Sequence, residues 1–286
     1  MTTITKVAAE EKSQLGECPV WCERKQCLYW IDIVGRTLFA LDPSTSDVRR
    51  WLLPEQVGSF ALTNNDDVLL LGLASRLAMF NLVDRSMTTI APSPGNHGTR
   101  IGDGRCDREG NFVFGTMDEA QQPRRIGAFY RLNAASLSIE RLDLPPTAIS
   151  NGICFSPDGA TFYFCDSMQQ RIFCCDYPSL DSQRVFADVV EGGAPDGSCI
   201  DSQGFLWNAE WGGGRLVRYS PQGIVDLVVP TAAQSTTCLA IGGASYNTMY
   251  CTTAQIGLES KNEADGALLC VELNEIRGLP ETLFAR

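Results

Sequence analysis

Three stretches that lie far apart in the chain each offer an oxygen-bearing side chain. They are Glu17 in LGECPVW, Asn151 in the Ser-Asn-Gly turn of residues 147–158, and Asp196 in APDG. Each stretch is predicted to be a loop between two apolar segments with strand character. Carboxylate and amide oxygens are the ligands that a hard divalent cation takes. The three residues therefore predict one oxygen-lined cation site, provided that the fold brings the loops together.

Asn151 also has a plainer interpretation, and the sequence offers few other catalytic devices. The Asn151-Gly152 dipeptide is typical of a hairpin turn, because glycine accepts a positive φ. A Ser-His-Asp triad would need His97, the single histidine, and the sequence has no G-x-S-x-G elbow. Cys18 has no histidine beside it in the sequence that would make it a thiolate nucleophile. Whether Asn151 only forms a turn or also binds a cation therefore depends on the fold.

The composition argues against several partners. The chain has 286 residues, 44% of them hydrophobic, and a formal net charge of −11 without any run of Lys or Arg. This charge argues against binding to nucleic acid or to an anionic membrane surface. Residues 1–14 lack the apolar core of a signal peptide, and the most apolar window, residues 68–83, contains Arg76 and is too short to span a bilayer. We expect a cytoplasmic protein.

The twelve cysteines include no C-x-x-C pair, and a single histidine cannot complete a zinc-finger spacing. Several of them fall inside apolar runs, where cysteine behaves as a small hydrophobic residue; these are Cys165, Cys174, Cys251 and Cys270. Disulfides are rare in cytoplasmic proteins. We therefore expect reduced thiols with a structural role.

A strand–turn–strand pattern recurs along the chain, and no long stretch has the apolar spacing of a helix. Equivalent positions in successive repeats are Trp30, Leu71, Phe114, Phe164, Trp207 and Cys251. The steps between them are about 40 to 50 residues, the length of a four-stranded propeller blade, and such an even period argues against a β-sandwich pair. The pattern predicts an all-β fold, a six-bladed β-propeller formed by a single domain over residues 1–286.

Residues 3–9 have strand character and no partner within their own repeat. We expect them to pair with the last repeat around residues 268–273 and so to close the ring, which removes an exposed edge. Corresponding loops of successive blades would then face one central channel. Glu17, Asn151 and Asp196, each expected just before the innermost strand of a blade, would meet there as a metal site.

Seven short motifs occur in order along nearly the whole chain: GECPVW at 16–21, WID at 30–32, RIGDG at 100–104, GTM at 115–117, SNG at 150–152, PDG at 195–197 and CLAIGG at 238–243. In this order they resemble the SMP-30/gluconolactonase family, also called the regucalcin family, of six-bladed propellers. The resemblance implies that Glu17, Asn151 and Asp196 bind one divalent metal. It also implies that Arg100 and Glu119 contact the substrate.

The same resemblance implies hydrolysis of a sugar-acid lactone, such as a pentono- or hexonolactone, to the open-chain acid in a sugar oxidation pathway. A metal held by two carboxylates and an amide polarises a carbonyl and lowers the pKa of bound water. Asp196 is the candidate general base that takes a proton from this water. We expect Ca²⁺, with Zn²⁺, Mg²⁺ and Mn²⁺ as alternatives. Two other functions stay open: a calcium-binding regulatory protein without turnover, and a hydrolase of other esters on the same scaffold.

Two residues near Arg100 bear on the choice of substrate. Gly102 stands where the family has an asparagine, so one polar contact to the substrate is missing. His97 either lines the channel mouth or lies in a solvent-exposed loop. Arg100 and Glu119 favour an enzyme over a binding protein, because metal storage needs neither of them.

Overall fold

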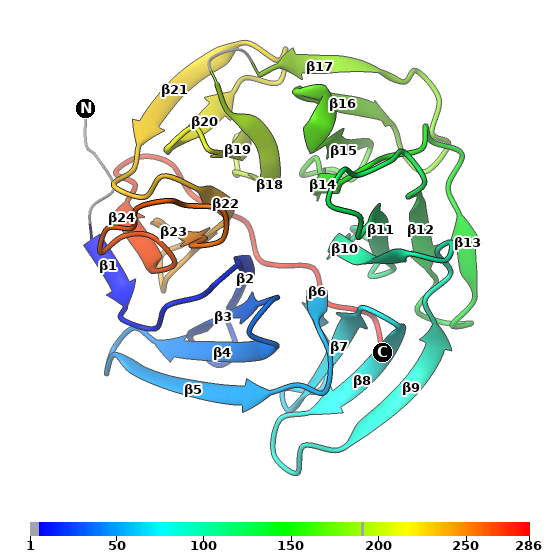
Figure 1. Ribbon diagram of the computed structural model, residues 1–286, viewed down its shortest axis with the longest axis horizontal. Coiled ribbons are helices and arrows are strands. Elements are labelled where there is room, and N and C mark those ends of the chain that lie inside the picture. Colours follow the sequence, from blue (N-terminus) through cyan, green and yellow to red (C-terminus); the bar gives the residue numbers. More distant parts are fainter. Residues whose placement is uncertain (1–5, 190–191) are drawn as a thin grey trace.

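The computed structural model describes residues 6–189 and 192–286. In this part of the chain, six antiparallel sheets of four strands each are arranged in a ring (Figure 1). The prediction of a six-bladed β-propeller is confirmed. Each blade begins with its innermost strand, and the chain then moves outward through the blade.

The first three blades follow one another directly along the chain. Blade 1 comprises β2 (Gly16–Cys22), β3 (Cys27–Asp32), β4 (Thr37–Asp42) and β5 (Asp47–Leu52). Blade 2 comprises β6 (Val57–Leu62), β7 (Val68–Leu73), β8 (Arg76–Asn81) and β9 (Met87–Pro92). Blade 3 comprises β10 (Thr99–Cys106), β11 (Phe112–Asp118), β12 (Phe129–Leu132) and β13 (Ile139–Arg141).

Blade 4 comprises β14 (Ser150–Phe155), β15 (Thr161–Asp166), β16 (Arg171–Asp176) and β17 (Arg184–Asp188), with the 3₁₀ turn η1 (Ser167–Gln169) between β15 and β16. Blade 5 comprises β18 (Ala194–Ile200), β19 (Leu206–Trp211), β20 (Arg215–Tyr219) and β21 (Val225–Pro230). Blade 6 comprises β22 (Thr236–Gly242), β23 (Thr248–Thr253) and β24 (Leu268–Glu272), completed by β1 (Lys6–Ala9). Among the described residues, no helix has the length and apolar character needed to cross a membrane.

The two ends of the chain close the ring in blade 6. β1 pairs with β24 in antiparallel register, with Lys6 opposite Cys270 and Val7 opposite Leu269. The predicted closure is thus confirmed for residues 6–9, whereas residues 3–5 lie outside the described part of the chain. This pairing gives β24 a partner on both sides and leaves β1 as the outer edge.

The predicted repeat positions all fall on the second strand of a blade. Trp30, Leu71, Phe114, Phe164, Trp207 and Cys251 belong to β3, β7, β11, β15, β19 and β23. Each of these residues is almost fully buried, because a second strand packs against neighbouring blades on both faces. Because both faces of each second strand are buried, the sequences of these strands are nearly continuous apolar runs.

Neighbouring blades are held together by aromatic side chains near the ring interior. Trp21 of blade 1 stacks on Tyr250 of blade 6, with ring centroids 6.1 Å apart. Phe129 of blade 3 meets Phe162 of blade 4 edge to face at 6.1 Å. Such pairs stabilise an interface beyond the apolar area that they bury. All twelve cysteines are buried with free thiols, as expected for reduced cysteines with a structural role.

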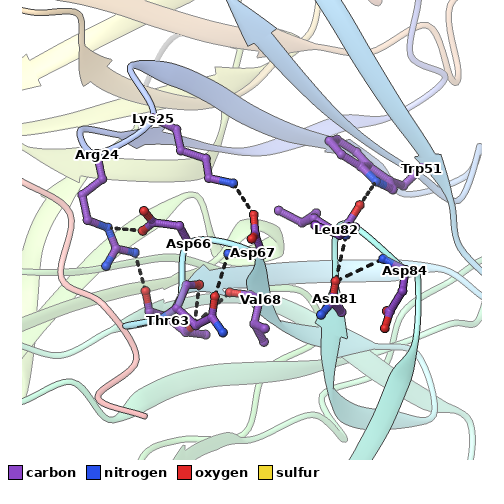
Figure 2. Close-up of polar contacts among 12 residues, drawn as sticks. Arg24, Lys25, Trp51, Thr63, Asp66, Asp67, Val68, Asn81, Leu82 and Asp84 are labelled. Atoms are coloured by element: carbon purple, nitrogen blue, oxygen red, sulfur yellow. Dashed lines mark hydrogen bonds and ion pairs between the residues drawn. The ribbon is translucent and has the colours of Figure 1, made fainter.

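Polar contacts between turns add to the interface of blades 1 and 2 (Figure 2). The turn after β2 places Arg24 Nε 2.7 Å from Asp66 and Lys25 Nζ 2.7 Å from Asp67. The indole of Trp51 donates to the carbonyl oxygen of Leu82 at 2.9 Å. The contacts of Arg24 and Lys25 lie beyond the last residues of β2, away from the first residues of that strand.

The C-terminal segment after β24 crosses the ring at this same end (Figure 1). Its Phe284 is fully buried and donates its backbone N–H to the carbonyl of Leu62 at 2.8 Å. Its Glu281 accepts from Arg105, a residue near the end of β10, at 3.2 Å. The segment therefore covers one end of the channel, and the other end, where the inner strands begin, is free for a ligand.

Candidate active site

The innermost strands carry β-bulges close to their first residues. The pairing register breaks between Glu17 and Val20 in β2, between Ile101 and Gly104 in β10, between Asn151 and Cys154 in β14, and between Pro195 and Ser198 in β18. A bulge leaves residues unpaired and re-aims the side chains beside it. Asp103 and Asp196 lie inside their bulges, and Glu17 and Asn151 are the last paired residues before theirs.

The prediction that Glu17, Asn151 and Asp196 occupy loops just before the inner strands is wrong. They lie within β2, β14 and β18, because the bulges supply the irregular backbone that the loops were expected to supply. The Asn151-Gly152 dipeptide likewise forms no hairpin turn. Gly152 has a φ of 68°, and this left-handed conformation explains why the bulge contains a glycine.

Three carboxyl groups meet at the bulges and repel one another. Burial, and then the neighbouring Asp103 carboxylate, raises the pKa of Glu17 to about 8. Burial, and then Glu17, raises the pKa of Asp196 well above its ordinary value, and burial also raises the pKa of Asp103. Among the described residues, no lysine or arginine forms an ion pair with any of the three. The charges of Arg100 and Arg105 act on Glu17 and Asp103 without direct ion pairs, so the negative charge of the three carboxylates is only partly compensated within this part of the chain.

Asp103 also links two blades. One carboxylate oxygen accepts the N–H of Gly104 in its own strand, and the other accepts the N–H of Ile153 in β14, each at 2.8 Å. These bonds satisfy backbone groups that the two bulges remove from the sheet ladder. Asp103 therefore fixes the bulge that follows Asn151 against the bulge of β10.

The side chain of Asn151 is oriented by two further hydrogen bonds. Its Nδ2 donates to the hydroxyl of Ser167 at 3.0 Å, and that hydroxyl donates to the carbonyl of Pro195 at 2.8 Å. Because the amide nitrogen is held by Ser167, the amide oxygen is left available to a ligand. The chain Asn151–Ser167–Pro195 also joins blade 4 to the bulge of blade 5.

A pocket of about 460 Å³ opens at this end of the channel, and its size suits a small molecule. Glu17, Asp103, Asn151 and Asp196 all line it, and so does Arg100. The remaining wall is mostly apolar and includes Leu15, Ile33, Met117, Ile149, Met168, Trp211 and Ile256. The structure thus brings the three predicted metal ligands into one pocket with a single arginine.

Arg100 is only 9% exposed. Its Nη1 donates to the carbonyl of Ile101 at 3.0 Å, which leaves other N–H groups for a ligand. Burial lowers its pKa, whereas the charges of Glu119 and Glu17 act in the opposite direction. A buried guanidinium beside carboxylates can bind neutral oxygen acceptors without competition from bulk water.

Two other residues considered from the sequence lie outside the pocket lining. Glu119 follows β11, is exposed, and donates its backbone N–H to Gly98 at 3.0 Å; its side chain influences Arg100 only through its charge. His97 is exposed in the loop before β10. The structure therefore favours the loop interpretation of His97, and it places Glu119 near Arg100 but not among the pocket residues.

Gly102 lines the pocket without a positive φ, so its backbone does not require glycine. A Cβ atom at this position would lie 3.2 Å from Ser150 Oγ and 3.6 Å from Met117 Cγ. The Ser150 hydroxyl is buried and has no hydrogen-bond partner. A side chain at this position would therefore press on Ser150 Oγ, and glycine leaves that hydroxyl facing the place where the resemblance implies an asparagine.

Sequence reasoning missed Asp103, although the motif that contains it was recognised. The available signal was an acidic residue between two glycines in a strand-like segment, which is unusual for a blade interior. Cys18 is excluded as a nucleophile, because burial raises the pKa of its thiol and its Sγ lies 3.8 Å from the carbonyl of Phe60. Its φ of 48° belongs to the bulge that positions Glu17.

The donor set fits a hard divalent cation. Carboxylate oxygens of Glu17 and Asp196 and the amide oxygen of Asn151 are all-oxygen ligands of the kind that Ca²⁺ takes. Among the described residues, no three His, Cys, Asp or Glu side chains are grouped as a metal site, and the amide oxygen of Asn151 would complete the donor set of Glu17 and Asp196. Buried carboxylates without partners are costly unless a cation compensates them.

Comparison with known proteins gives consistent matches. The family model described as SMP-30/Gluconolactonase/LRE-like region matches residues 15–255. An L-arabinolactonase of Azospirillum brasilense is 47% identical over 90% of this chain and 86% of its own, and a 6-deoxy-6-sulfogluconolactonase of Pseudomonas putida is 33% identical over 100% of both. The crystal structure of a calcium-binding protein, regucalcin, from Agrobacterium tumefaciens superposes with a TM-score of 0.92 at 26% identity over 100% of both chains.

Proposed function

This chain belongs to the SMP-30/gluconolactonase/LRE-like family and is a lactone hydrolase, and we propose that it opens a neutral five-carbon aldonolactone with the help of Ca²⁺. The observation that carries the proposal is the convergence of Glu17, Asn151 and Asp196 on one pocket that also holds Arg100. The similarity to an arabinolactonase supports the five-carbon substrate. The similarity to a calcium-binding protein supports the metal.

The pocket residues have separate roles in hydrolysis. When bound, a divalent cation supplies Lewis acidity, which polarises a carbonyl and lowers the pKa of water. Asp196 accepts a proton from the attacking water, whose oxygen bonds to the carbonyl carbon of the lactone. The bond between that carbon and the ring oxygen then breaks, and the proton passes from Asp196 to the ring oxygen. The product is the open-chain hydroxy acid.

Arg100 positions the substrate in this scheme. Its guanidinium offers N–H groups in a planar fork, which can bind two hydroxyl or carbonyl oxygens at a fixed separation. Because Arg100 is almost fully buried, these bonds form away from competing water. Glu119 remains a proposed substrate contact that acts from outside the pocket lining.

The charge of the pocket favours a neutral substrate. Glu17, Asp103 and Asp196 carry three negative charges when ionised and Arg100 carries one positive charge, so a dication makes the lining electrically neutral. A lactone that bears a sulfonate or a carboxylate would add a negative charge, and the lining residues offer no second arginine or lysine to compensate it. We therefore place neutral aldonolactones first.

Two broader features remain predictions: a single domain over residues 1–286, and a cytoplasmic location. The first would be tested by a single cooperative unfolding transition. The second would be tested by fractionation of the native host.

The proposed function is tested with a panel of neutral pentono- and hexonolactones, using acid release as the readout. The protein is first stripped of metal with a chelator and then supplied with Ca²⁺, Zn²⁺, Mg²⁺ or Mn²⁺ in separate reactions. We expect turnover only after metal is restored, with Ca²⁺ as the most effective ion. Ca²⁺ binding without hydrolysis of any lactone would favour a regulatory protein, and hydrolysis of phosphotriesters alone would favour another esterase.

A further inference from the structure

Three apolar side chains stand at the mouth of the pocket: Met168, Trp211 and Ile256, here called the apolar rim. Met168 is 60% exposed and Ile256 is 44% exposed, and Trp211 is half-buried. They come from blades 4, 5 and 6, which are neighbours in the ring (Figure 1). Large apolar side chains exposed beside a binding pocket are typical of a surface that a ligand covers.

The backbone holds Met168 in a fixed position relative to the candidate metal site. Met168 is the central residue of η1, and its N–H donates to the carboxylate of Asp166 at 3.3 Å. The preceding residue, Ser167, contacts both Asn151 and Pro195 through its hydroxyl. The position of Met168 is therefore tied to the residue that orients a metal ligand.

The other two rim residues are tied to the site in the same way. Trp211 ends β19 and pairs with Ala194, two residues before Asp196. The N–H of Ile256 donates to the carbonyl of Gln14 at 3.0 Å, three residues before Glu17. The backbone of all three members of the rim is thus tied to the segments that carry the candidate metal ligands.

Apart from Trp211, the polar side chains that line the pocket all belong to the candidate metal and substrate site described above: Glu17, Arg100, Asp103, Asn151, Ser167 and Asp196. The rim itself has two hydrogen-bonding side-chain groups: the indole N–H of Trp211, which can only donate, and the thioether sulfur of Met168, which is a weak acceptor. A substrate hydroxyl placed against the rim would therefore lose water and find only this weak side-chain acceptor for its proton. Such a loss is costly, whereas a methyl group there would bury apolar area on both sides.

We infer that the apolar rim recognises an apolar group on the part of the sugar lactone farthest from the carbonyl, so that 6-deoxyaldonolactones are substrates and are preferred over the lactones that carry a hydroxyl on carbon 6. This inference rests on the proposed function, which it refines. Pentonolactones lack carbon 6 and so place no hydroxyl at the position of that carbon; the hydroxyl on carbon 5 is common to the 1,4-lactones of both sizes and does not enter the comparison. Gly102 is consistent with this preference, since it removes a polar contact elsewhere in the pocket.

The test uses three lactones with the same ring stereochemistry: L-arabinono-, D-fucono- and D-galactono-1,4-lactone. They differ in carrying no carbon 6, a methyl group or a hydroxymethyl group at that position. The Ca²⁺-loaded wild-type protein is expected to show a kcat/KM for the fucono-lactone about 10-fold above that for the galactono-lactone, the size of effect that one apolar group produces in a pocket. A ratio of one or below would overturn the inference.

The variants Met168→Gln and Ile256→Ser give the rim hydrogen-bonding groups, alone and together. We expect the ratio of fucono- to galactono-lactone to fall toward one, chiefly through better use of the galactono-lactone. Ile224→Ser is the matched control, because Ile224 is 68% exposed in the turn between β20 and β21 and does not line the pocket. The control should keep the wild-type ratio.

The outcomes separate this inference from the proposed function. Hydrolysis of all three lactones with no preference for the methyl group, or with a preference that the double variant Met168→Gln/Ile256→Ser leaves unchanged, overturns the inference and leaves the proposed function standing. If none of the three lactones is hydrolysed by the Ca²⁺-loaded protein, both fail. A methyl preference that only the rim variants reduce supports both.

Discussion

Substituting Ser167 by alanine tests whether Asn151 is a metal ligand that is held in place by its neighbour. The Ser167 hydroxyl accepts from Asn151 Nδ2 at 3.0 Å and donates to the carbonyl of Pro195 at 2.8 Å. Ser167→Ala removes both bonds, and each is worth about 0.5–1.5 kcal/mol, so the free energy of unfolding should fall by about 1–3 kcal/mol. The amide of Asn151 would then be free to rotate.

The larger effect of Ser167→Ala should fall on the metal. Losing a residue that orients a ligand lowers metal affinity by about 10- to 100-fold, which equals about 1.4–2.7 kcal/mol of binding free energy. At saturating Ca²⁺ the rate of lactone hydrolysis should recover toward the wild-type value, because Ser167 has no part in the chemical step. Calorimetric titration of metal-free protein with Ca²⁺ measures the affinity, and acid release at several Ca²⁺ concentrations measures the recovery.

Ser179→Ala is the matched control for this experiment. Ser179 is exposed in the same blade, and its hydroxyl only accepts a backbone N–H at 3.4 Å. This control should bind Ca²⁺ as tightly as the wild type. If Ser167→Ala also kept its Ca²⁺ affinity within about twofold while its stability fell as expected, the reasoning would be refuted, and Asn151 would not be a ligand held by Ser167.

Three other changes test separate parts of the account. Arg100→Lys should mainly raise KM for polyhydroxylated lactones, because an ammonium group cannot form the guanidinium fork; an unchanged KM would place Arg100 outside substrate recognition. The Cβ of the variant Gly102→Asn would lie 3.2 Å from Ser150 Oγ, and this variant should lower kcat/KM for the pentonolactone and raise it for glucono- or galactonolactone. A uniform change for all lactones would mean that residue 102 affects stability or the backbone of its segment and not the choice of substrate. The side chain of Arg124 lowers the pKa of Asp118 to about 2, so this pair stabilises the fold above the ordinary pKa of about 4 and loses that contribution as the pH falls toward 2. Urea unfolding of the wild type and of Asp118→Asn at pH 3 and pH 6 should therefore differ more at pH 6, and an equal difference at both pH values would contradict this.

The ring itself was predictable because each blade repeats one burial pattern. Trp30, Phe114 and Trp207 marked the period since each lies on a second strand, where both faces are buried and apolar residues are required. The partner of β1 was predictable for a related reason: a strand without a partner in its own repeat must find one at the other end of the chain. The repeated apolar pattern of the sequence was therefore enough to predict the propeller.

The details of the site were not predictable, because they depend on pairing between distant segments. A β-bulge is defined by the register between two strands, so the sequence around Glu17 or Asp196 could equally describe a loop. The bond from Ile153 to Asp103 joins residues 50 positions apart, and the contact of Arg105 with Glu281 joins residues 176 positions apart. Nothing local in the sequence indicates which end of the channel the C-terminal segment covers.

The most direct test of the central proposal measures Ca²⁺ binding and L-arabinono-1,4-lactone hydrolysis together in the wild type and in Asp196→Asn. In the wild type, turnover should follow occupancy of the metal site, so that half-maximal activity coincides with half-saturation by Ca²⁺. With metal bound, Asp196→Asn should lose about 100- to 10,000-fold in kcat, because an amide cannot accept the proton from water. Full activity after exhaustive chelation, or an Asp196→Asn protein that binds Ca²⁺ and keeps most of its kcat, would contradict the account.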